Sequence, residues 1–361
     1  MKIKDLAEAA LIAKYDIKFV ILNSTKNHES ENLKYIKVDF PSNKFIKAIS
    51  QKLFRYKYIE KHVDMSGYDA VILRYPLAFG VGVTHFYRKY GNKIYTEHHT
   101  NEGAELRKIG STKIIGIAFS LYEDFRKGAI LKYCRGLIGV TDEIRRHEIS
   151  FVPKIPSHTM SNGINVSRVR IAKRGGRDDN RLHIIFLAAR FAPWHGLDYA
   201  ILGIQKYIGD VPLTLHVVGN ISNISQIMDF KNSSLAILIY HGELHNEQLD
   251  NLFDQIDIGI SSLGIHRIGL HEASVLKTRE YFARGIPFVY GYDDSDLTGN
   301  EPYGRRVHVQ KKGYLDFDEL VTMHDQVSVH PNLRVLMREQ AKLKIDWQSK
   351  LSSLVNFVEK N

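Results

Sequence analysis

The 361-residue chain has one cysteine, Cys134, and no apolar run approaching the ~18–20 residues that a membrane-spanning helix needs. A single cysteine excludes an internal disulfide and a cysteine metal cluster, which fits a reducing compartment. The opening residues lack the apolar core and small-residue cleavage site of a signal peptide, so a cytoplasmic location is expected. The apolar fraction of 44% and the charged fraction of 25% exclude wholesale disorder.

The net charge of +10 is distributed unevenly along the chain. Residues 1–170 contain 29 Lys+Arg and 17 Asp+Glu, a balance of +12, whereas residues 171–361 contain 21 and 23, a balance of −2. This asymmetry indicates that the first half meets a polyanion or an anionic surface. An accumulation of surface lysines without function is the alternative.

Short apolar or β-branched runs alternate with helical patterns along the whole chain. The runs predict strands at 18–24, 35–40, 69–75, 93–98, 136–141, 182–189, 213–219, 235–240, 257–262 and 287–292. Helical patterns fall between them, for example at 43–62, 115–133, 196–208, 246–254 and 274–284. The alternation predicts an α/β protein with two doubly wound parallel-sheet domains that face a cleft.

A polar, glycine-containing segment at 167–181 has no apolar period and is interpreted as the linker. We therefore expect an N-terminal domain at 1–170 and a C-terminal domain at 171–335. The remaining stretch, 336–361, reads as a helical segment that could pack back on the N-terminal domain. No internal repeat of short period is present.

The segment 261–290 contains the most specific pattern, with Glu272 and Glu280 eight positions apart. Glu280 begins EYFARGIP, which leads into an apolar strand, and Glu272 lies in the loop before the predicted helix. The backbone from Ala273 to Lys277 would then present free N–H groups at a helix N-terminus, where an anion is favoured. A solvated helix face is the alternative for the two glutamates.

This segment resembles the E-x7-E signature of the retaining glycosyltransferases of family 4, which have the GT-B fold and act in bacterial surface-polysaccharide biosynthesis. Three further segments agree in order and spacing. FLAARFAPWHGLDYAI resembles the strand, loop and helix that grip the donor diphosphate, LTLHVVGN resembles the next strand, and MSNGINVSRV resembles the Asn-Gly turn that closes the N-terminal domain. The resemblance covers about 160–350 and is weak over 1–135.

The resemblance implies a role for individual residues. Glu280 would hydrogen-bond the ribose hydroxyls of a nucleotide, and Glu272 would sit near the hydroxyls of the donor sugar. Arg190 would contact the diphosphate through its bidentate fork, with a surface ion pair as the alternative. Gly219 would let the chain approach the donor closely. The other implied donor-binding positions are His195 and the backbone of Ala273, Ser274, Val275, Leu276 and Lys277.

The chain departs from this family in two places. The family's Lys before Gly is His195 here, and a histidine is mostly neutral near pH 7. We hypothesise that Lys277 supplies the missing positive charge. The chain also begins with the helical pattern Asp5–Lys14, so the family's first strand and glycine-rich loop are expected to be missing or altered.

The strand predicted at 93–98 runs into a pair of histidines, His98 and His99. A histidine at this strand end resembles the family's histidine that points at the donor sugar. Strand alternation places the two side chains on opposite faces, so at most one of them faces the ligand. A purely structural histidine is the alternative for either.

The segment 43–62 predicts a basic amphipathic helix with aromatic residues along its apolar stripe. Such a helix could lie on an anionic membrane or meet the acceptor, and a core-facing helix with a lysine-rich solvent face is the alternative. The positive residues that would serve this role are Lys47, Lys52, Arg55 and Lys57.

Together these features predict a retaining glycosyltransferase that moves a sugar from a nucleotide-diphosphate sugar to a glycan or lipid-linked acceptor. No metal or other cofactor is expected, because the family works without one and Asp293-Asp294-Ser295-Asp296 is better explained as a turn after a strand. The predicted location is cytoplasmic, with a peripheral position on the membrane as an option. The alternatives are a nucleotide-sugar epimerase of the same fold and a non-catalytic binding partner. Nucleic-acid binding is suggested by charge alone, without a motif.

Overall fold

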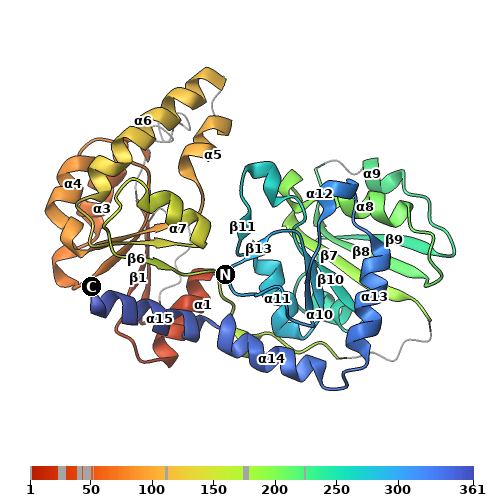
Figure 1. The fold of residues 1–361 in the computed structure, drawn as a ribbon. Coiled ribbons are helices and arrows are strands. Elements are labelled where there is room, and N and C mark those ends of the chain that lie inside the picture. Colours follow the sequence, from red (N-terminus) through yellow and green to blue (C-terminus); the bar gives the residue numbers. More distant parts are fainter. Residues whose placement is uncertain are drawn as a thin grey trace. The chain divides into compact units, whose positions relative to one another are not determined.

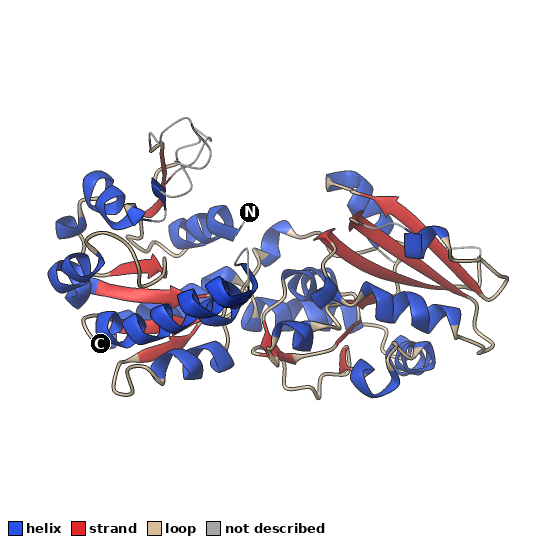
Figure 2. Cartoon of the chain, turned by 90° about the horizontal axis from the view of Figure 1, so that it is seen from above, coloured by secondary structure: helices blue, strands red, loops and turns tan. Residues whose placement is uncertain are grey.

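The computed structural model describes residues 2–22, 30–38, 43, 50–51, 53–109, 113–173, 179–222 and 225–361. The chain forms two compact units (Figure 1). Unit 1 comprises Met1–Ser161 and Lys350–Asn361, and unit 2 comprises Asn162–Ser349. Each unit contains a parallel β-sheet with helices packed along it, as Figure 2 shows. The predicted α/β class with parallel sheets in two domains is therefore confirmed.

Unit 1 is built on a four-stranded parallel sheet in the order β3-β4-β5-β6, and β1 and β2 form a separate parallel pair. Its strands are β1 Phe19–Leu22, β2 Leu33–Ile36, β3 Val71–Arg74, β4 Ile94–His98, β5 Gly136–Gly139 and β6 Ser157–Thr159. Its helices are α1 Lys2–Ile12, α3 Arg55–His62, α4 Val83–Tyr90, α5 Glu102–Ile109, α6 Lys113–Leu131, α7 Asp142–Ile149 and the greater part of α15 Trp347–Lys360.

The last helix, α15, closes unit 1 although it is the end of the chain. Its Phe357 ring packs against Tyr95 of β4 and His158 of β6, with ring centroids 5.6 and 5.1 Å apart. Ser352 forms a 2.9 Å hydrogen bond with Tyr15, which follows α1. The preceding helix, α14 Leu333–Lys344, belongs to unit 2. The region expected as one C-terminal segment, 336–361, is therefore divided between the units.

Unit 2 contains a six-stranded parallel sheet in the order β14-β12-β10-β7-β8-β9. The chain winds outwards from β7 through β8 to β9, and then returns to place β10 on the other side of β7. Its strands are β7 Leu182–Arg190, β8 Leu213–Asn220, β9 Ala236–Gly242, β10 Ile258–Ile260, β12 Phe288–Tyr290 and β14 Gly304–Arg306. The winding therefore reverses between β7 and β10, and in open α/β sheets ligands bind outside the carboxyl ends of the strands at such a point.

The helices of unit 2 bury apolar residues in one extensive core that they share with the strands of the sheet. They are α8 Leu197–Gln205, α9 Ser225–Met228, α10 Asn246–Phe253, α11 Leu276–Arg284, α12 Val309–Lys312, α13 Phe317–Ser328 and α14. A two-stranded parallel pair, β11 Glu272–Ala273 and β13 Asp293–Asp294, lies outside the main sheet.

The boundary between the units lies at Ser161/Asn162, before the predicted linker at 167–181. Residues just before and within the predicted linker are hydrogen-bonded into unit 2: Val166 N–H donates to Asp346, and Ala172 N–H donates to the carbonyl of Arg284. A polar segment without apolar period can thus be fixed by backbone bonds, and composition alone does not reveal them. Residues 174–178 lie outside the described residues.

Every strand predicted from the sequence is present, with ends displaced by a few residues. The predictions omitted β6, β11, β13 and β14, which are two or three residues long and partly polar. The helical ranges given as examples also did not include α4, α5, α7, α9, α12 or the twelve-residue α13. Among the described residues, no helix combines the length and the apolar composition required to cross a membrane.

Candidate donor site in unit 2

A cluster of hydroxyl groups fixes the first turn of α11 to the carboxyl ends of two strands. Thr278 lies 2.6 Å from Ser261, which follows β10, and 2.6 Å from the hydroxyl of Tyr292, which follows β12. Ser261 and Tyr292 are themselves 3.1 Å apart, and all three side chains are buried. The start of α11 therefore lies at the carboxyl edge of the sheet, next to β10. This strand is one of the two, β7 and β10, between which the winding of the sheet reverses.

Arg190 and Gly219 lie on adjacent strands at the same edge. Arg190 is the last residue of β7, is exposed, and pairs in register with Asn220 of β8. Gly219 has a φ of +126°, and a Cβ atom there would lie 1.6 Å from the carbonyl oxygen of Ala188. Only glycine, which has no Cβ atom, fits this position, because β7 and β8 approach each other closely there. The resemblance places the donor at the same point.

His195 ends the short 3₁₀ turn Pro193–His195 that follows β7. The backbone N–H of Ala192 donates to its Nδ1 at 2.9 Å, so the proton of the neutral ring is on Nε2. The carbonyl of His195 accepts from Leu263 N–H, which joins the loops after β7 and β10. Burial, with a smaller contribution from Lys277, lowers the pKa of His195 to about 4. The imidazole is therefore uncharged at neutral pH.

Lys277, the second residue of α11, is only 6% exposed. Its ammonium nitrogen lies 4.6 Å from the ring centroid of Phe186 in β7 and 6.0 Å from that of Phe191. Within the described part of the chain, this nitrogen has no hydrogen-bond partner. Burial lowers the pKa of Lys277 well below its ordinary value of 10.5. The lysine that the sequence singled out therefore reaches the strand that carries Arg190.

The predicted helix start at Ala273–Lys277 is only partly helical. Ala273 is in β11 with Glu272, and α11 begins at Leu276 after the N-cap residue Val275, which has no capping side chain. Ser274 instead anchors the loop, because its hydroxyl accepts from Asn162 N–H at 2.7 Å. The amides of Leu276 and Lys277 are the ones at the helix N-terminus, where a helix has no internal acceptor for them.

Glu280 and Glu272, the paired glutamates, lie on different elements. Glu280 is on α11, and its Oε1 accepts a 2.7 Å bond from Arg284, which also pairs with Asp250 at 2.6 Å. Glu272 is half-buried in β11, opposite Asp293 of β13. Glu280 therefore belongs to a charged network with Arg284 and Asp250. The carboxylate of Glu280 still has lone pairs that can accept a hydrogen bond from a ligand hydroxyl.

The acidic segment 293–296, predicted as a turn, begins with the two-residue strand β13 and turns only at 295–296, and a buried arginine explains its charges. Arg279 of α11, 1% exposed, forms ion pairs with Asp294 and with Asp296, and donates to Ser274 at 3.0 Å. The sequence analysis missed Arg279, because a charged residue on a helix is ordinarily taken for a surface group. The arginine ties the loop before α11 to the loop after β12 and so holds the helix start in place.

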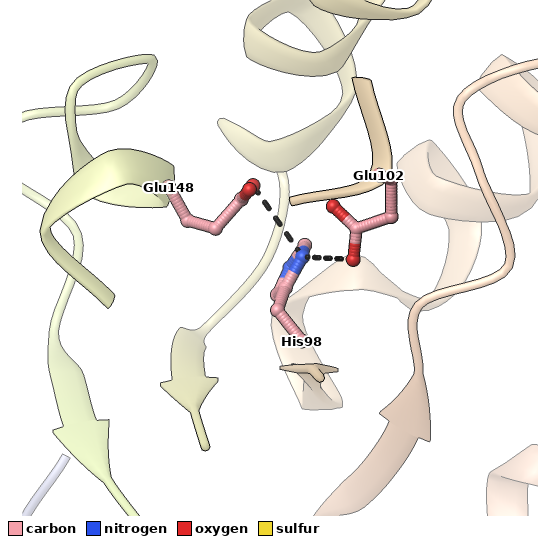
Figure 3. A group of neighbouring side chains, drawn as sticks. All are labelled: His98, Glu102 and Glu148. Carbon is pink, nitrogen blue, oxygen red and sulfur yellow. Dashed lines mark hydrogen bonds and ion pairs between the residues drawn. The ribbon is translucent and has the colours of Figure 1, made fainter. Parts of the chain in front are cut away.

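In unit 1, His98 and His99 differ in their surroundings. His98, at the end of β4, is fully buried and stacks on Tyr75 with ring centroids 4.4 Å apart. Figure 3 shows its Nδ1 between two carboxylates, Glu102 at 3.2 Å and Glu148 at 3.4 Å. His99 is half-buried, and its Nε2 lies 2.9 Å from a carboxylate oxygen of Glu97.

The ligand atoms of His98, Glu102 and Glu148 lie within 4.8 Å of one another, a grouping that could hold a metal ion. The ammonium of Lys127 of α6 already lies between the carboxylates, 3.0 Å from Glu102 and 2.9 Å from Glu148. Lys127 thus supplies the positive charge that a metal would bring. This cluster was not predicted from the sequence, because its members are on four separate elements: β4, α5, α6 and α7.

Of the residues predicted for a membrane or acceptor surface, Lys47 and Lys52 lie outside the described residues. Arg55 begins α3, donates to the carbonyl of Pro76 and lies over the ring of Phe79 at 5.8 Å. Burial lowers the pKa of Arg55. Lys57 is exposed. The next residue after Arg55, Tyr56, is fully buried, so this helix packs on the core through Tyr56.

No protein-family model matches the chain, and no curated protein sequence matches it. Solved structures do match over nearly its whole length. Sucrose-phosphate synthase from Thermosynechococcus elongatus is 13% identical, with a TM-score of 0.64 over 99% of this chain and 92% of that one. The lipopolysaccharide outer core galactosyltransferase WaaB is 11% identical, with a TM-score of 0.59 over 99% and 94%.

A third similar structure, HepE from Anabaena in complex with UDP and glucose, is 9% identical, with a TM-score of 0.54 over 91% of this chain and 86% of that one. At these identities the likeness concerns the fold. The chain has the GT-B fold.

Proposed function

We propose that this chain is a glycosyltransferase that transfers a sugar from a nucleotide-diphosphate sugar to a glycan or lipid-linked acceptor. The supporting observation is the convergence in unit 2 of Arg190, Gly219, Lys277 and the start of α11 at the reversal of strand order. An anion is favoured there by free backbone N–H groups and by the helix dipole. Two of the similar structures bear the names of sugar-transferring enzymes, and HepE contains UDP and glucose.

In the proposed reaction, the bond between the sugar and the diphosphate breaks, and negative charge collects on the leaving nucleoside diphosphate. Arg190, Lys277 and the amides at the start of α11 would stabilise that charge where it develops. We propose retention of the anomeric configuration and independence from metals, in keeping with family 4. The acceptor hydroxyl gives up its proton as the new glycosidic bond forms. Activity that persists in EDTA, with an anomerically retained product, would support both features.

The donor site is tested by thermal unfolding of the full chain with UDP, GDP and ADP sugars. We expect one donor class to raise the melting temperature by several degrees at saturating concentration. Glu280→Ala should weaken that donor about tenfold, because a carboxylate that binds hydroxyls is lost. Arg284 keeps its bond to Asp250 in this variant. Glu247→Ala, an exposed glutamate of α10, is the matched control. If none of the three donor classes shifts the wild type, the proposed function is wrong.

Product analysis separates the remaining alternatives. A glycosyltransferase yields a new glycoside and nucleoside diphosphate, whereas an epimerase releases free sugar and nucleotide. A non-catalytic partner protein binds the donor and yields neither. The family histidine is tested in the same assay: if His99 faces the donor sugar, His99→Ala lowers turnover while leaving the unfolding temperature near that of the wild type.

We also propose that unit 1 associates peripherally with an anionic membrane at the cytoplasmic face, where lipid-linked acceptors would be met in polysaccharide biosynthesis. A stripe at helical spacing on α6 supports this, because Ile114, Leu121 and Phe125 are 79%, 62% and 81% exposed. The excess positive charge of residues 1–170 adds attraction to anionic lipid.

Co-sedimentation of the full chain with liposomes tests the membrane proposal. Vesicles containing phosphatidylglycerol should retain more protein than pure phosphatidylcholine vesicles. The double variant Leu121→Ser/Phe125→Ser should reduce binding several-fold, since two apolar side chains are lost from the interface. Val335→Ser/Leu343→Ser removes two exposed apolar side chains of α14 in unit 2 and is the matched control. Equal losses in both variants would contradict a role of α6.

A further inference from the structure

The other buried basic side chains of α11 are matched by carboxylates, and Lys277 is the exception. Arg279 pairs with Asp294 and Asp296, and Arg284 pairs with Asp250 and Glu280. Lys277 instead rests on the ring of Phe186, and its nitrogen has no hydrogen-bond partner within the described part of the chain. A buried ammonium without a counter-charge is costly, so the position points to an anion that is brought from outside.

Among the described residues, a titratable group that interacts with Lys277 is His195, on the loop after β7. That neighbour, His195, is uncharged, because its Nδ1 accepts from a backbone N–H and its pKa is about 4. The charged groups of its own helix are engaged in the ion pairs described above, and the hydroxyls of Thr278, Ser261 and Tyr292 bond to one another. Burial of the amine lowers the pKa of Lys277.

We propose that Lys277 is the cation that binds the donor's diphosphate in this chain, with His195 as an uncharged hydrogen-bond donor beside it. This inference rests on the proposed function and assigns the charge at its phosphate subsite. In the family that the sequence resembles, the residue before the glycine is a lysine, which carries the positive charge. Here the residue before Gly196 is His195, which offers a neutral Nε2–H, and the positive charge comes from Lys277, the second residue of α11. The amides of Leu276 and Lys277 complete the set of donors.

Binding of the diphosphate changes the protonation of the Lys277 amine. In the unliganded protein the amine is held against Phe186 without a counter-charge, which favours its neutral form. Its flexible four-carbon stem lets the nitrogen turn towards the first turn of the helix. A bound diphosphate favours the ammonium, so the amine takes one proton from the buffer as the anion binds. No covalent bond is made or broken in this step.

The sign of the pH effect follows from this linkage. Because the pKa of Lys277 is lower in the free protein than in the complex, proton uptake occurs between those two values. In that range, diphosphate affinity falls as the pH rises. In the free protein His195 is neutral above pH 6, since its pKa is about 4.

Isothermal titration calorimetry of the full chain in buffers of different ionisation heat measures this uptake. The probes are inorganic pyrophosphate and, separately, UDP, GDP and ADP. We expect the wild type to take up more protons per bound anion than Lys277→Met does. The difference between the two proteins removes the protons that the ligand itself exchanges. Lys277→Met should bind the anion roughly tenfold more weakly or worse.

A second variant distinguishes loss of charge from loss of structure. Combining Lys277→Met with His195→Lys moves the cation to the position before Gly196. The double variant should regain most of the lost affinity with less proton uptake, since position 195 is only half-buried and a lysine there keeps more of its charge in the free protein than the buried Lys277 does. Failure of this rescue in a variant that unfolds like the wild type would overturn the assignment of the missing charge.

The outcomes separate the inference from the proposed function. If a nucleotide binds wild type and Lys277→Met equally, with equal proton uptake, the inference is wrong and the donor site stands. If pyrophosphate binds with Lys277-dependent proton uptake while no nucleotide binds, Lys277 is confirmed as an anion-binding cation, but the ligand is not a nucleotide-sugar donor and the proposed function is wrong. If neither pyrophosphate nor any nucleotide binds, both are overturned.

Discussion

The two units each bury a lysine, and they treat its charge in opposite ways. In unit 1, Lys127 is fully buried and lies within 3.0 Å of both Glu102 and Glu148. These carboxylates outweigh the effect of burial and raise the pKa of Lys127. In unit 2, Lys277 has aromatic neighbours and a neutral histidine, and burial lowers its pKa. A buried lysine that is paired with carboxylates stabilises a fold. A buried lysine without a counter-charge is suited to binding a ligand that brings the negative charge.

The compensated cluster is larger than the pair of carboxylates around Lys127. Tyr75, which stacks on His98, donates to Glu123 at 2.7 Å, and the backbone of Ala78 donates to the same carboxylate. Lys127 also lies 5.4 Å from the ring centroid of Tyr75. The cluster therefore fixes β4, α6 and α7 together through charge, while unit 2 fixes α11 with hydroxyl groups and arginine.

The largest expected effect is on the stability of unit 1. Lys127→Met should lower the free energy of unfolding by about 3–5 kcal/mol, because it leaves two buried carboxylates facing each other without a cation. Chemical unfolding followed by circular dichroism measures it. Lys132→Met, which changes an exposed lysine just after α6, is the control and should change stability by less than about 0.5 kcal/mol. Equal free energies of unfolding for Lys127→Met and Lys132→Met would show that Lys127 does not stabilise the cluster.

The next effect is a pH dependence that comes from Glu148. Burial raises the pKa of Glu148 to about 7, above its ordinary 4.5. The folded state therefore binds a proton that the unfolded state has released, and this stabilisation is lost as the pH rises from about 4.5 through 7.

Glu148→Gln should remove this loss, which we expect to be about 1–3 kcal/mol between pH 5 and pH 8. Urea unfolding at a series of pH values measures it. Below pH 4.5, Glu102 has the opposite effect, because its contribution to stability is lost as the pH falls. The hydrogen bond with His98 and the charges of His98 and Lys127 outweigh burial and lower the pKa of Glu102 to about 2. An unchanged slope between pH 5 and pH 8 in Glu148→Gln would count against a raised pKa.

The smallest expected effect is on unit 2 without ligand, and it has the opposite sign. Lys277→Met should raise the free energy of unfolding by about 1 kcal/mol at pH 7, because the buried amine no longer has to lose its proton or remain charged on folding. The lowered pKa means that this gain shrinks as the pH rises towards 10.5. Thermal unfolding at pH 7 and pH 9.5 measures it. A loss of stability comparable with that of Lys127→Met would remove the contrast between the two lysines.

Short-range patterns were sufficient for the architecture. Continuous apolar runs such as 182–189 and 213–219 predicted the buried parallel strands, because a strand covered on both faces has no polar alternation. The glutamate spacing at 272 and 280 predicted the region of α11. The position of the boundary did not follow in the same way, since backbone hydrogen bonds of residues 162–172 decide it, and composition carries no information about them.

The sequence by itself determined the fold class, the glycine that β8 requires and the replacement of a lysine by His195. These depend on local properties of the chain: apolar period, backbone freedom and side-chain charge. Only the tertiary structure decided that His98 lies in a carboxylate cluster, that Arg279 is paired and that Lys277 has no hydrogen-bond partner among the described residues. The reason is that the pKa and the energy of a buried charge depend on which distant residues surround it, and chain order does not specify those neighbours.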